Sequence, residues 1–592
     1  MPNASDSLGS IFKRVYRLLE APERKRGILL LVLILVNSVV DIFGLAVVIP
    51  VIGLVADPAL IERSGLLNRL YTATGFSSHE PFIILLSVVM FGAALFKAVF
   101  GILVVYVQTR FSFAVAHRLS GTMWDALFGS SLEQMRSTSS GRVISKINVW
   151  PVGFANIYLV SMVALMTEFF VVLFVAVGLV LYNPVVFVLV VIIISTGSIL
   201  LRVYTRARLA SYSAIVRELE PHSNTAVTGA IRGFLEIVTF GAVSSVRNYY
   251  LRLTERIYRI RSNLSVLSQA PIKLYESLAV LSITVAIILS LTLNFSEELF
   301  TTLSLLAIAA YRVMPAVSRF SGALLKIRGS AHLLEAMEDG VETAVSQANA
   351  PTSAPSDKIT RVEIDLDDLT LGYKALREPV ISALSARFKP GSLYAIVGPS
   401  GSGKSTLISA LLGLHQPVEG NIAMRRDGGG QRRLYADLGQ LEWLAHTAYL
   451  AQHPFLFEGT VRENLTLRIP SFRLDVDLVN DLVDRLELRS SLGSDPLQFV
   501  LQEGGSNLSG GQQQRLALLR ALQVERPVLI LDEATSALDE RMRDIVFALL
   551  RERADAGATV ILVTHDMDIA AQCDERLNLT VRTIVGNDEQ TS

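Results

Sequence analysis

A glycine-rich segment that ends in a lysine and two hydroxyl residues is the clearest chemical signal in this chain. It consists of Gly398, Pro399, Ser400, Gly401, Ser402, Gly403, Lys404, Ser405 and Thr406. Glycines let backbone N–H groups approach phosphate oxygens, and the helix that follows adds a favourable dipole. The segment follows the apolar run Leu393–Val397, which is the context that a phosphate-binding loop requires. We therefore expect Lys404 to neutralise phosphate charge and Ser405 to bind Mg²⁺.

A second apolar run, Val528–Leu531, ends in two acidic residues, Asp532 and Glu533. The run is typical of a buried strand, which would deliver both carboxyl groups to the edge of a sheet. Asp532 is suited to hold Mg²⁺ directly or through a water molecule. Glu533 is placed to act as the general base that polarises a water attacking the terminal phosphate.

The elements that must position these residues occupy only part of a 592-residue chain, which is too long for one hydrophobic core. Hydrophobic residues make up 51% and charged residues 18%, and the mean hydropathy is +0.45. These values indicate membrane segments, since a soluble domain has roughly 25% charged residues. The net charge of zero gives no support to nucleic-acid binding, and a single cysteine, Cys573, excludes an intramolecular disulfide.

Six apolar segments are long enough to cross a bilayer as helices. They lie at roughly 28–56, 81–106, 157–182, 185–202, 275–293 and 299–320. Asn183 and Pro184 form a tight turn between the third and fourth segments. The polar stretches between the second and third segments, and between the fourth and fifth, look helical, so the spans should continue beyond the bilayer.

Basic residues concentrate before the first segment and in residues 203–274, whereas residues 57–80 contain only Arg63 and Arg69 against three acids. The positive-inside bias therefore places the N-terminus, the long connections and the C-terminal region in the cytoplasm. We expect a multi-pass protein of the inner or plasma membrane. The stretch Ile11–Leu19 is compatible with an amphipathic helix on the inner membrane surface or with a solvated leader.

The composition changes after the last apolar segment. Residues 345–360 are rich in Ala, Ser and Pro, which predicts a linker. From Arg361 onward, strand and helix patterns alternate. The predicted fold is an α-helical six-span membrane domain in residues 1–344, followed by an α/β phosphate-loop nucleotide-binding domain in residues 361–592.

Between the phosphate loop and the acidic pair lies the sequence Leu508-Ser509-Gly510-Gly511-Gln512. With this element, residues 361–592 resemble the nucleotide-binding domain of an ATP-binding cassette (ABC) transporter. The resemblance implies ATP and Mg²⁺ as cofactors and ATP hydrolysis coupled to transport. It also implies that Ser509, Gly510, Gly511 and Gln512 bind ATP.

The same resemblance implies roles for five further positions or segments. Tyr373 would stack on adenine, Gln452 would touch Mg²⁺, and His565 would contact the γ-phosphate. Glu503–Ser506 would contact intracellular helices, and Ser536–Asp539 would link two nucleotide sites.

Two features depart from the family pattern. Asp566-Met567 follows His565 where exporters usually have Arg-Leu, and residues 425–433 form a basic, glycine-rich excursion. Neither touches the phosphate chemistry, so we expect activity to survive both.

One chain carries one cassette, and in this family the signature of one cassette closes over the nucleotide of another. A homodimer is therefore the simplest assembly, and a heterodimer with a related half-transporter is the alternative.

Ionisable residues inside membrane spans are costly and therefore indicate function. The candidates for binding substrate are Asp41, Lys97, Arg312 and Arg319, and the last two share a helical face. The competing interpretation is that these charges pair with one another or with nearby groups. The further candidates for such pairs are Glu168, Lys273 and Glu276.

Six spans followed by a cassette resemble the exporter branch of the family. Asp41–Pro50 and Tyr311–Arg319 further resemble the first and sixth spans of bacterial flippases for lipid-linked oligosaccharides. This implies an amphiphilic, lipid-linked substrate whose pyrophosphate meets the arginines. The alternatives are export of lipid A, a hydrophobic peptide or drugs, and a channel or regulator that uses ATP for gating. Six spans exclude a soluble cassette ATPase of DNA repair or translation.

Overall fold

The computed structural model describes residues 7–579 except for short internal segments. These are residues 47–53, 55–60, 62–64, 77, 130–134, 136–137, 183, 293–298, 349–360, 374–377, 427–429 and 436–439. The chain divides into a helical unit that ends at Gln347 and an α/β unit that begins at Ala348. Each unit is described by itself.

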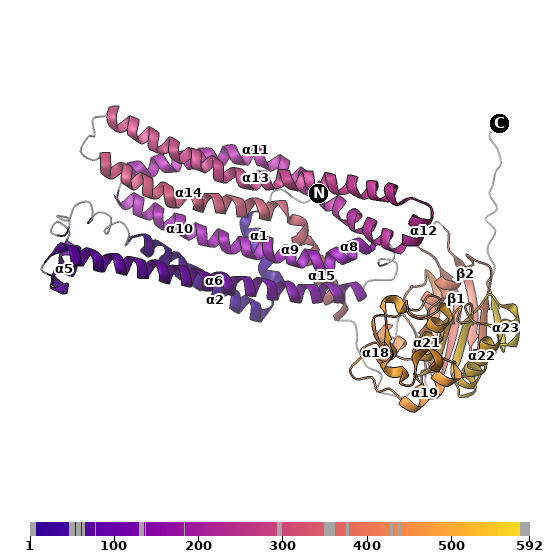
Figure 1. Cartoon of the computed structure of the whole chain (residues 1–592). Helices are drawn as coiled ribbons and strands as arrows, with labels where there is room; N and C mark the ends of the chain where they lie inside the picture. Colours follow the sequence, from indigo (N-terminus) through magenta and orange to yellow (C-terminus); the bar gives the residue numbers. More distant parts are fainter. Residues whose placement is uncertain are drawn as a thin grey trace, which may run out of the picture. The chain divides into compact units, whose positions relative to one another are not determined.

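Every predicted span falls on a helix over its described residues (Figure 1). The six long helices are α2 (Ala21–Ala46), α6 (His79–Phe128), α10 (Val160–Tyr182), α11 (Pro184–Arg232), α13 (Val243–Thr292) and α14 (Leu299–Gly329). The shorter elements are α1 (Leu8–Leu18), α5 (Gly65–Thr74), α8 (Ser140–Ile144), α9 (Trp150–Phe154), α12 (Phe234–Thr239), α15 (Ala331–Ala348) and the π-helical turns η1 (Ser145–Val149) and η2 (Ala155–Leu159). In the described part of the chain, His79–Phe128 and Ser140–Gly178 are long and apolar enough to be candidate membrane spans.

Three helices of the helical unit are much longer than a bilayer is thick. Helices α6 and α13 have 50 residues each and α11 has 49. At 1.5 Å per residue, such a helix is about 75 Å long, against about 30 Å for a hydrocarbon core. The predicted helical extensions are therefore confirmed. Helices α11 and α13 run side by side and are joined through α12 (Figure 1).

Helix α1 is amphipathic, as its sequence predicts, but its apolar face is covered by protein. Ile11, Val15 and Leu18 are buried in a cluster with residues of α6 that include Val115 and Leu119. The alternative of a solvated leader is therefore wrong, because the apolar face of α1 packs against the long helices, and a position at the inner membrane surface stays a prediction.

The α/β unit contains an antiparallel sheet and a parallel sheet. The antiparallel sheet has the order β2-β1-β4-β5 and the parallel sheet has the order β11-β3-β10-β9-β6. Their strands are β1 (Val362–Leu371), β2 (Ile381–Phe388), β4 (Glu419–Arg426), β5 (Gln431–Arg433), and β3 (Leu393–Val397), β6 (Thr447–Leu450), β9 (Val528–Asp532), β10 (Thr559–Val563) and β11 (Glu575–Asn578). A small ribbon pairs β7 (Gly459–Thr460) with β8 (Val500–Leu501).

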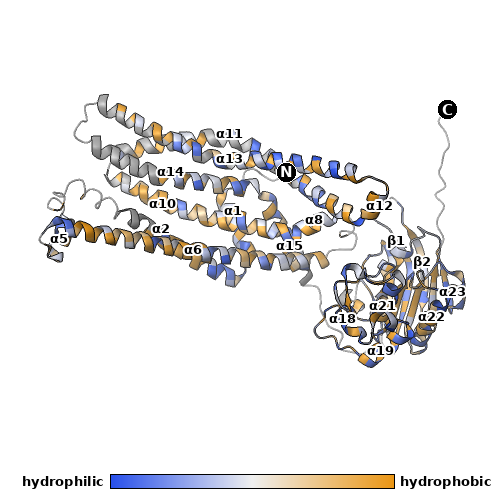
Figure 2. Ribbon diagram, in the orientation of Figure 1, coloured by the Kyte–Doolittle hydropathy of each residue, from blue (hydrophilic) through white to orange (hydrophobic). Residues whose placement is uncertain are grey.

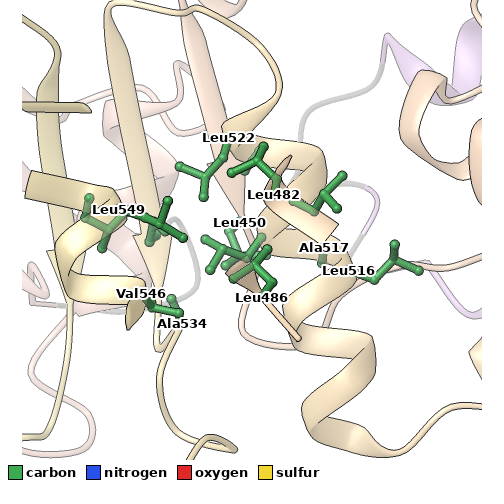
Figure 3. Close-up of a cluster of buried hydrophobic side chains, with 14 of the residues drawn as sticks. Leu450, Leu482, Leu486, Leu516, Ala517, Leu522, Ala534, Val546 and Leu549 are labelled. Carbon is green, nitrogen blue, oxygen red and sulfur yellow. The ribbon is translucent and has the colours of Figure 1, made fainter. Parts of the chain in front are cut away.

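Helices α17 (Gln440–Ala445), α21 (Gly510–Leu522), α22 (Glu540–Asp555) and α23 (Met567–Gln572) contact the parallel sheet and bury its apolar strands. The other helices are α16 (Lys404–Leu411), α18 (Val461–Thr466), α19 (Val476–Arg485) and α20 (Arg489–Leu492), with short turns η3 (Pro496–Gln498) and η4 (Glu503–Gly505). Figure 3 shows the main cluster, in which Leu516 and Ala517 of α21 pack with Leu450, Leu482 and other buried residues. Strands β3 and β10 are buried throughout, which explains their continuous apolar sequences.

The predicted linker begins too early. Helix α15 continues to Ala348, so residues 345–348 are helical, and residues 349–360 lie outside the described part of the chain. The Ala, Gln and Val residues at this end are compatible with a last helical turn, whereas the first proline comes at Pro351.

Candidate nucleotide-binding site

Four loops meet at one edge of the parallel sheet because its strands run in the same direction. The phosphate loop follows β3, Glu533 follows β9, His565 follows β10 and Gln452 follows β6. The register pairs Val563 with both neighbouring strands, so these ends are level. The carboxyl edge of such a sheet is the usual place for a ligand.

Glycines give the phosphate loop its backbone conformation, and the Lys404 side chain bonds back to the start of the loop. Gly403 has a φ of +93°, and a Cβ there would lie 2.9 Å from Ile381 Cγ1, so the position requires glycine. The buried Lys404 Nζ donates to the carbonyl oxygens of Gly398 at 2.6 Å and Pro399 at 2.9 Å. Ser402 Oγ is buried and has no hydrogen-bond partner among the described residues. The loop therefore holds an ammonium group and an unsatisfied hydroxyl beside a helix start.

Burial, and then the charge of Glu533, raise the pKa of Asp532, while the charges of Lys404 and His565 oppose the shift. A carboxylate that is disfavoured by burial and by a like charge gains from a bound cation. Ser405, Gln452 and Asp532 supply hydroxyl, amide and carboxylate oxygens, which are ligands that Mg²⁺ prefers. The residues present therefore fit a magnesium ion.

Both carboxylate oxygens of Glu533 are engaged by neighbouring loops. Oε2 accepts from Gln452 Nε2 at 2.8 Å, and Oε1 lies 2.7 Å from His565 Nε2. The sheet order explains this arrangement, because β9 lies between β6 and β10. The residue also has a φ of +52°, an unusual conformation for a glutamate. Three predicted site residues are thus brought together around one carboxylate.

Tyr373 packs against a histidine that sequence reasoning did not single out. Its ring lies 4.8 Å from the ring of His415, centroid to centroid, and its hydroxyl lies 3.2 Å from Thr406 Oγ1. The hydroxyl of Tyr373 is therefore next to the end of the phosphate loop, and adenine stacking stays a prediction. A lone histidine carries no sequence signal that would have indicated this contact.

The signature residues begin helix α21. Ser509 is the N-cap, and its hydroxyl accepts from Gln512 N while the Gln512 side chain accepts from Ser509 N, which completes a capping box. Gln512 Nε2 also donates to Ser491 Oγ at 2.6 Å. Ser509 and Gly510 are exposed, so they are available to a further molecule.

The unusual Asp566 after His565 has a structural role. Its side chain accepts from the N–H groups of Asp568 and Ile569 and caps α23. It also pairs with Arg543 Nη1 at 2.7 Å. These bonds, the one from Ile569 most strongly, lower the pKa of Asp566. The departure from the family pattern thus stabilises the segment that carries His565.

Among the charged residues of the helical unit, Arg319 forms an ion pair with Glu168. Its guanidinium donates from Nε and Nη2 to the carboxylate of Glu168, which is buried. Lys273 pairs with Glu276 at 2.9 Å. The side chains of Asp41 and Arg312 lie outside the described part of the chain.

Lys97 lines a wide-open surface cavity of about 530 Å³ together with Asn37 of α2 and small and apolar residues of α6. Gly101 of α6 lies beside Asn37 of α2, since a Cβ at Gly101 would be in ordinary van der Waals contact with Asn37 Oδ1, at 3.9 Å. The cavity therefore combines an ammonium group and an amide with an apolar wall.

The family model described as ABC transporter matches residues 381–536. Residues 381–536 form an ABC transporter domain. The match spans the phosphate loop, the signature and the acidic pair, which the geometry places on one cassette. The predicted resemblance is confirmed for this domain.

Curated relatives match less than half of the chain. The mycobactin import ATP-binding/permease protein IrtB of Mycolicibacterium smegmatis is 36% identical over 276 residues, which are 45% of this chain and 44% of IrtB. The lactococcin-G-processing and transport ATP-binding protein LagD of Lactococcus lactis is 36% identical over 233 residues, which are 39% of this chain and 32% of LagD. The chain thus aligns with less than half the length of these relatives.

Among solved structures, a bacterial Atm1-family ABC exporter with ATP bound matches with a TM-score of 0.74 and 20% identity. The match covers 98% of this chain and 95% of that structure. The chain therefore has the fold of an ABC exporter, a helical domain followed by an ABC domain, as predicted.

Proposed function

We propose that this chain is one half of an ATP-driven membrane transporter. The observation that carries this proposal is the convergence of Gln452 and His565 on the carboxylate of Glu533, beside the phosphate loop. Such a site can hold the phosphates, place a water molecule and accept its proton. A domain used only to bind ATP would not need this general base, which argues against a channel that ATP merely gates.

In the proposed reaction, the backbone N–H groups of the loop and Lys404 bind the phosphates. Ser405, with Gln452 and Asp532, would hold Mg²⁺, which when bound neutralises charge on the β- and γ-phosphates. Glu533 orients the attacking water and takes a proton from it. His565 holds the other side of that carboxylate and is exposed enough to reach the γ-phosphate.

The helical unit is proposed to span a membrane. Helix α6 is hydrophobic over much of its length after His79 (Figure 2). Its exposed large apolar side chains include Ile84, Phe91, Val99 and Ile102. Exposed apolar surface of this extent is unfavourable in water and marks a lipid or protein contact. The exporter fold and the positive-inside pattern support six spans with the cassette in the cytoplasm of the cell.

A second copy of the chain is the proposed partner. Ser509 and Gly510 are exposed at the start of α21, where a second cassette could present its nucleotide. An intact phosphate loop, Glu533 and signature in one chain make a symmetric homodimer sufficient for two sites. A related half-transporter is the alternative partner.

The proposed cargo is an amphiphile with an anionic head, such as a lipid-linked oligosaccharide, moved from the inner leaflet outward. Lys97 supports this, because its ammonium group lines the cavity between α2 and α6. The charge of Arg319 is already compensated by Glu168. The names of IrtB and LagD indicate import of mycobactin and transport of lactococcin, which keeps lipid A, hydrophobic peptides and drugs as alternative cargoes.

The test uses the full-length protein reconstituted into liposomes. A polyprenyl-pyrophosphate glycolipid should accelerate phosphate release and change leaflet, whereas a neutral glycolipid with the same tail should do neither. Lys97→Glu should abolish the acceleration and leave basal hydrolysis intact, and Lys326→Glu, an exposed lysine of α14, serves as the control. Equal effects of the charged and neutral lipids would refute the anionic head group.

A further inference from the structure

A buried glutamine joins the signature helix to the catalytic carboxylate. Gln514 lies near the start of α21 and is only 3% exposed. Its Nε2 donates to the carbonyl oxygen of Glu533 at 2.8 Å, and its Oε1 accepts from Ala537 N at 3.2 Å. One side-chain amide thus spans the loop that begins at Glu533, using both its donor and its acceptor.

The backbone that Gln514 holds is strained. Glu533 has a φ of +52°, which costs of the order of 1 kcal/mol or more for a residue with a side chain. At the end of β9, Glu533 N donates to Val563 O of β10 at 3.0 Å. In the loop that follows, Ser536 Oγ donates to Glu533 O at 3.1 Å. The bond from Gln514 reaches the same carbonyl oxygen from a different element, α21.

Helix α21 is a rigid support for this amide. Leu516, Ala517 and Leu522 are buried in the main core of the domain (Figure 3). The helix begins with the capping box of Ser509 and Gln512, and Gln512 lies two residues before Gln514. A displacement of the signature residues would therefore move α21 and, through the Gln514 side chain, the backbone of Glu533.

We propose that Gln514 is a positioning residue that fixes the orientation of Glu533 relative to the signature. The proposal rests on the proposed ATPase function. Gln514 touches neither the phosphate loop nor Tyr373 in any hydrogen bond of the described residues, so its loss should affect the chemical step and spare nucleotide binding. The proposal also predicts that a normal kcat requires the N–H donor of the Gln514 amide, and not merely a side chain of the same volume.

The experiment compares Gln514→Leu and Gln514→Glu in the full-length protein. Both should lower kcat roughly 10- to 100-fold, since a small misplacement of a catalytic group has effects of this size, with KM and ATP affinity unchanged. In Gln514→Glu the ionised carboxylate cannot donate a hydrogen bond to the Glu533 carbonyl oxygen, but the protonated carboxylic acid can. The difference in kcat between Gln514→Glu and wild type should therefore decrease as the pH falls. Gln523→Leu is the matched control, because Gln523 is a buried glutamine of the same region that donates to Leu465 O at 2.7 Å.

The outcomes separate this inference from the proposed function. Wild-type kcat in both Gln514 variants, or a loss of ATP affinity that matches the loss of kcat, would overturn the positioning role. An equal loss of kcat in Gln523→Leu would show a general effect of instability and also overturn it. If Gln514→Leu does not fold, the pH profile of Gln514→Glu decides. A wild-type protein that binds ATP without hydrolysing it would instead refute the proposed ATPase.

Discussion

The carboxylate of Glu533 and the imidazole of His565 face each other across two neighbouring loops, with 2.7 Å between Oε1 and Nε2. The residues follow β9 and β10, whose parallel register pairs Asp532 with Val563. Gln452 occupies the other carboxylate oxygen from the opposite side. Glu533, the proposed general base, is therefore held by residues that follow the strands on both sides of β9.

Replacing Glu533 by glutamine should separate binding from hydrolysis. Glu533→Gln retains the size of the side chain but loses the proton acceptor, so the protein should bind ATP and hydrolyse it at least ~10²-fold more slowly. Phosphate release and equilibrium ATP binding measure the two effects. Glu540→Gln, at an exposed position at the start of α22, is the control. Near-normal phosphate release by Glu533→Gln would remove Glu533 from the catalytic role.

Ser509→Arg should abolish hydrolysis if the signature acts across a dimer, because a large cation would block the exposed end of α21. Loss of the cap alone costs about 1 kcal/mol, and Ser509→Ala controls for it. Mixing Ser509→Arg with Lys404→Ala chains should restore one composite site in each mixed dimer. Full ATPase activity from a stable monomer would contradict the arrangement.

The pair between Arg319 and Glu168 should govern the stability of the helical unit. Arg319→Ala leaves the buried Glu168 carboxylate without its partner, which should cost roughly 3 kcal/mol. Adding Glu168→Gln should recover much of the loss, because the unpaired charge is then removed. Thermal unfolding in detergent measures both effects. Identical melting temperatures for the single and double variants would show that the ion pair does not matter.

Asp566 should stabilise the ABC domain only above acidic pH. Hydrogen bonds from Ile569 N, from Asp568 N and from Arg543 lower its pKa below the ordinary 3.8. A lowered pKa means that the stabilisation is complete above the ordinary value and disappears as the pH falls through the folded value. Asp566→Ala should therefore cost about 1 kcal/mol near pH 7, through loss of the cap, and less in strong acid.

Denaturant unfolding at several pH values tests this prediction for Asp566. Asp566→Asn is the matched control, since asparagine caps a helix but cannot pair with Arg543. Its stability relative to wild type should fall only modestly at pH 7. A pH-independent effect of Asp566→Ala would contradict the role of its charge.

The sequence by itself determined the features that depend on consecutive residues. A phosphate loop uses successive backbone N–H groups, so Gly398–Thr406 could be recognised without tertiary information. The long apolar helices and the buried strands followed from composition and periodicity. Family resemblance added Gln452 and His565, which lie far from Glu533 in the chain.

Only the tertiary structure decided which distant groups meet. Strand order and helix packing bring together residues that are distant in the chain. Examples are the hydrogen bond from Gln514 to Glu533, the ion pair of Arg319 with Glu168 and the ion pair of Asp566 with Arg543. Helix α1 illustrates the same limit, because an amphipathic stripe does not specify whether lipid or protein covers it. Local sequence patterns show which face of a helix or strand is apolar. Which other element packs against that face depends on the free energy of the complete folded core.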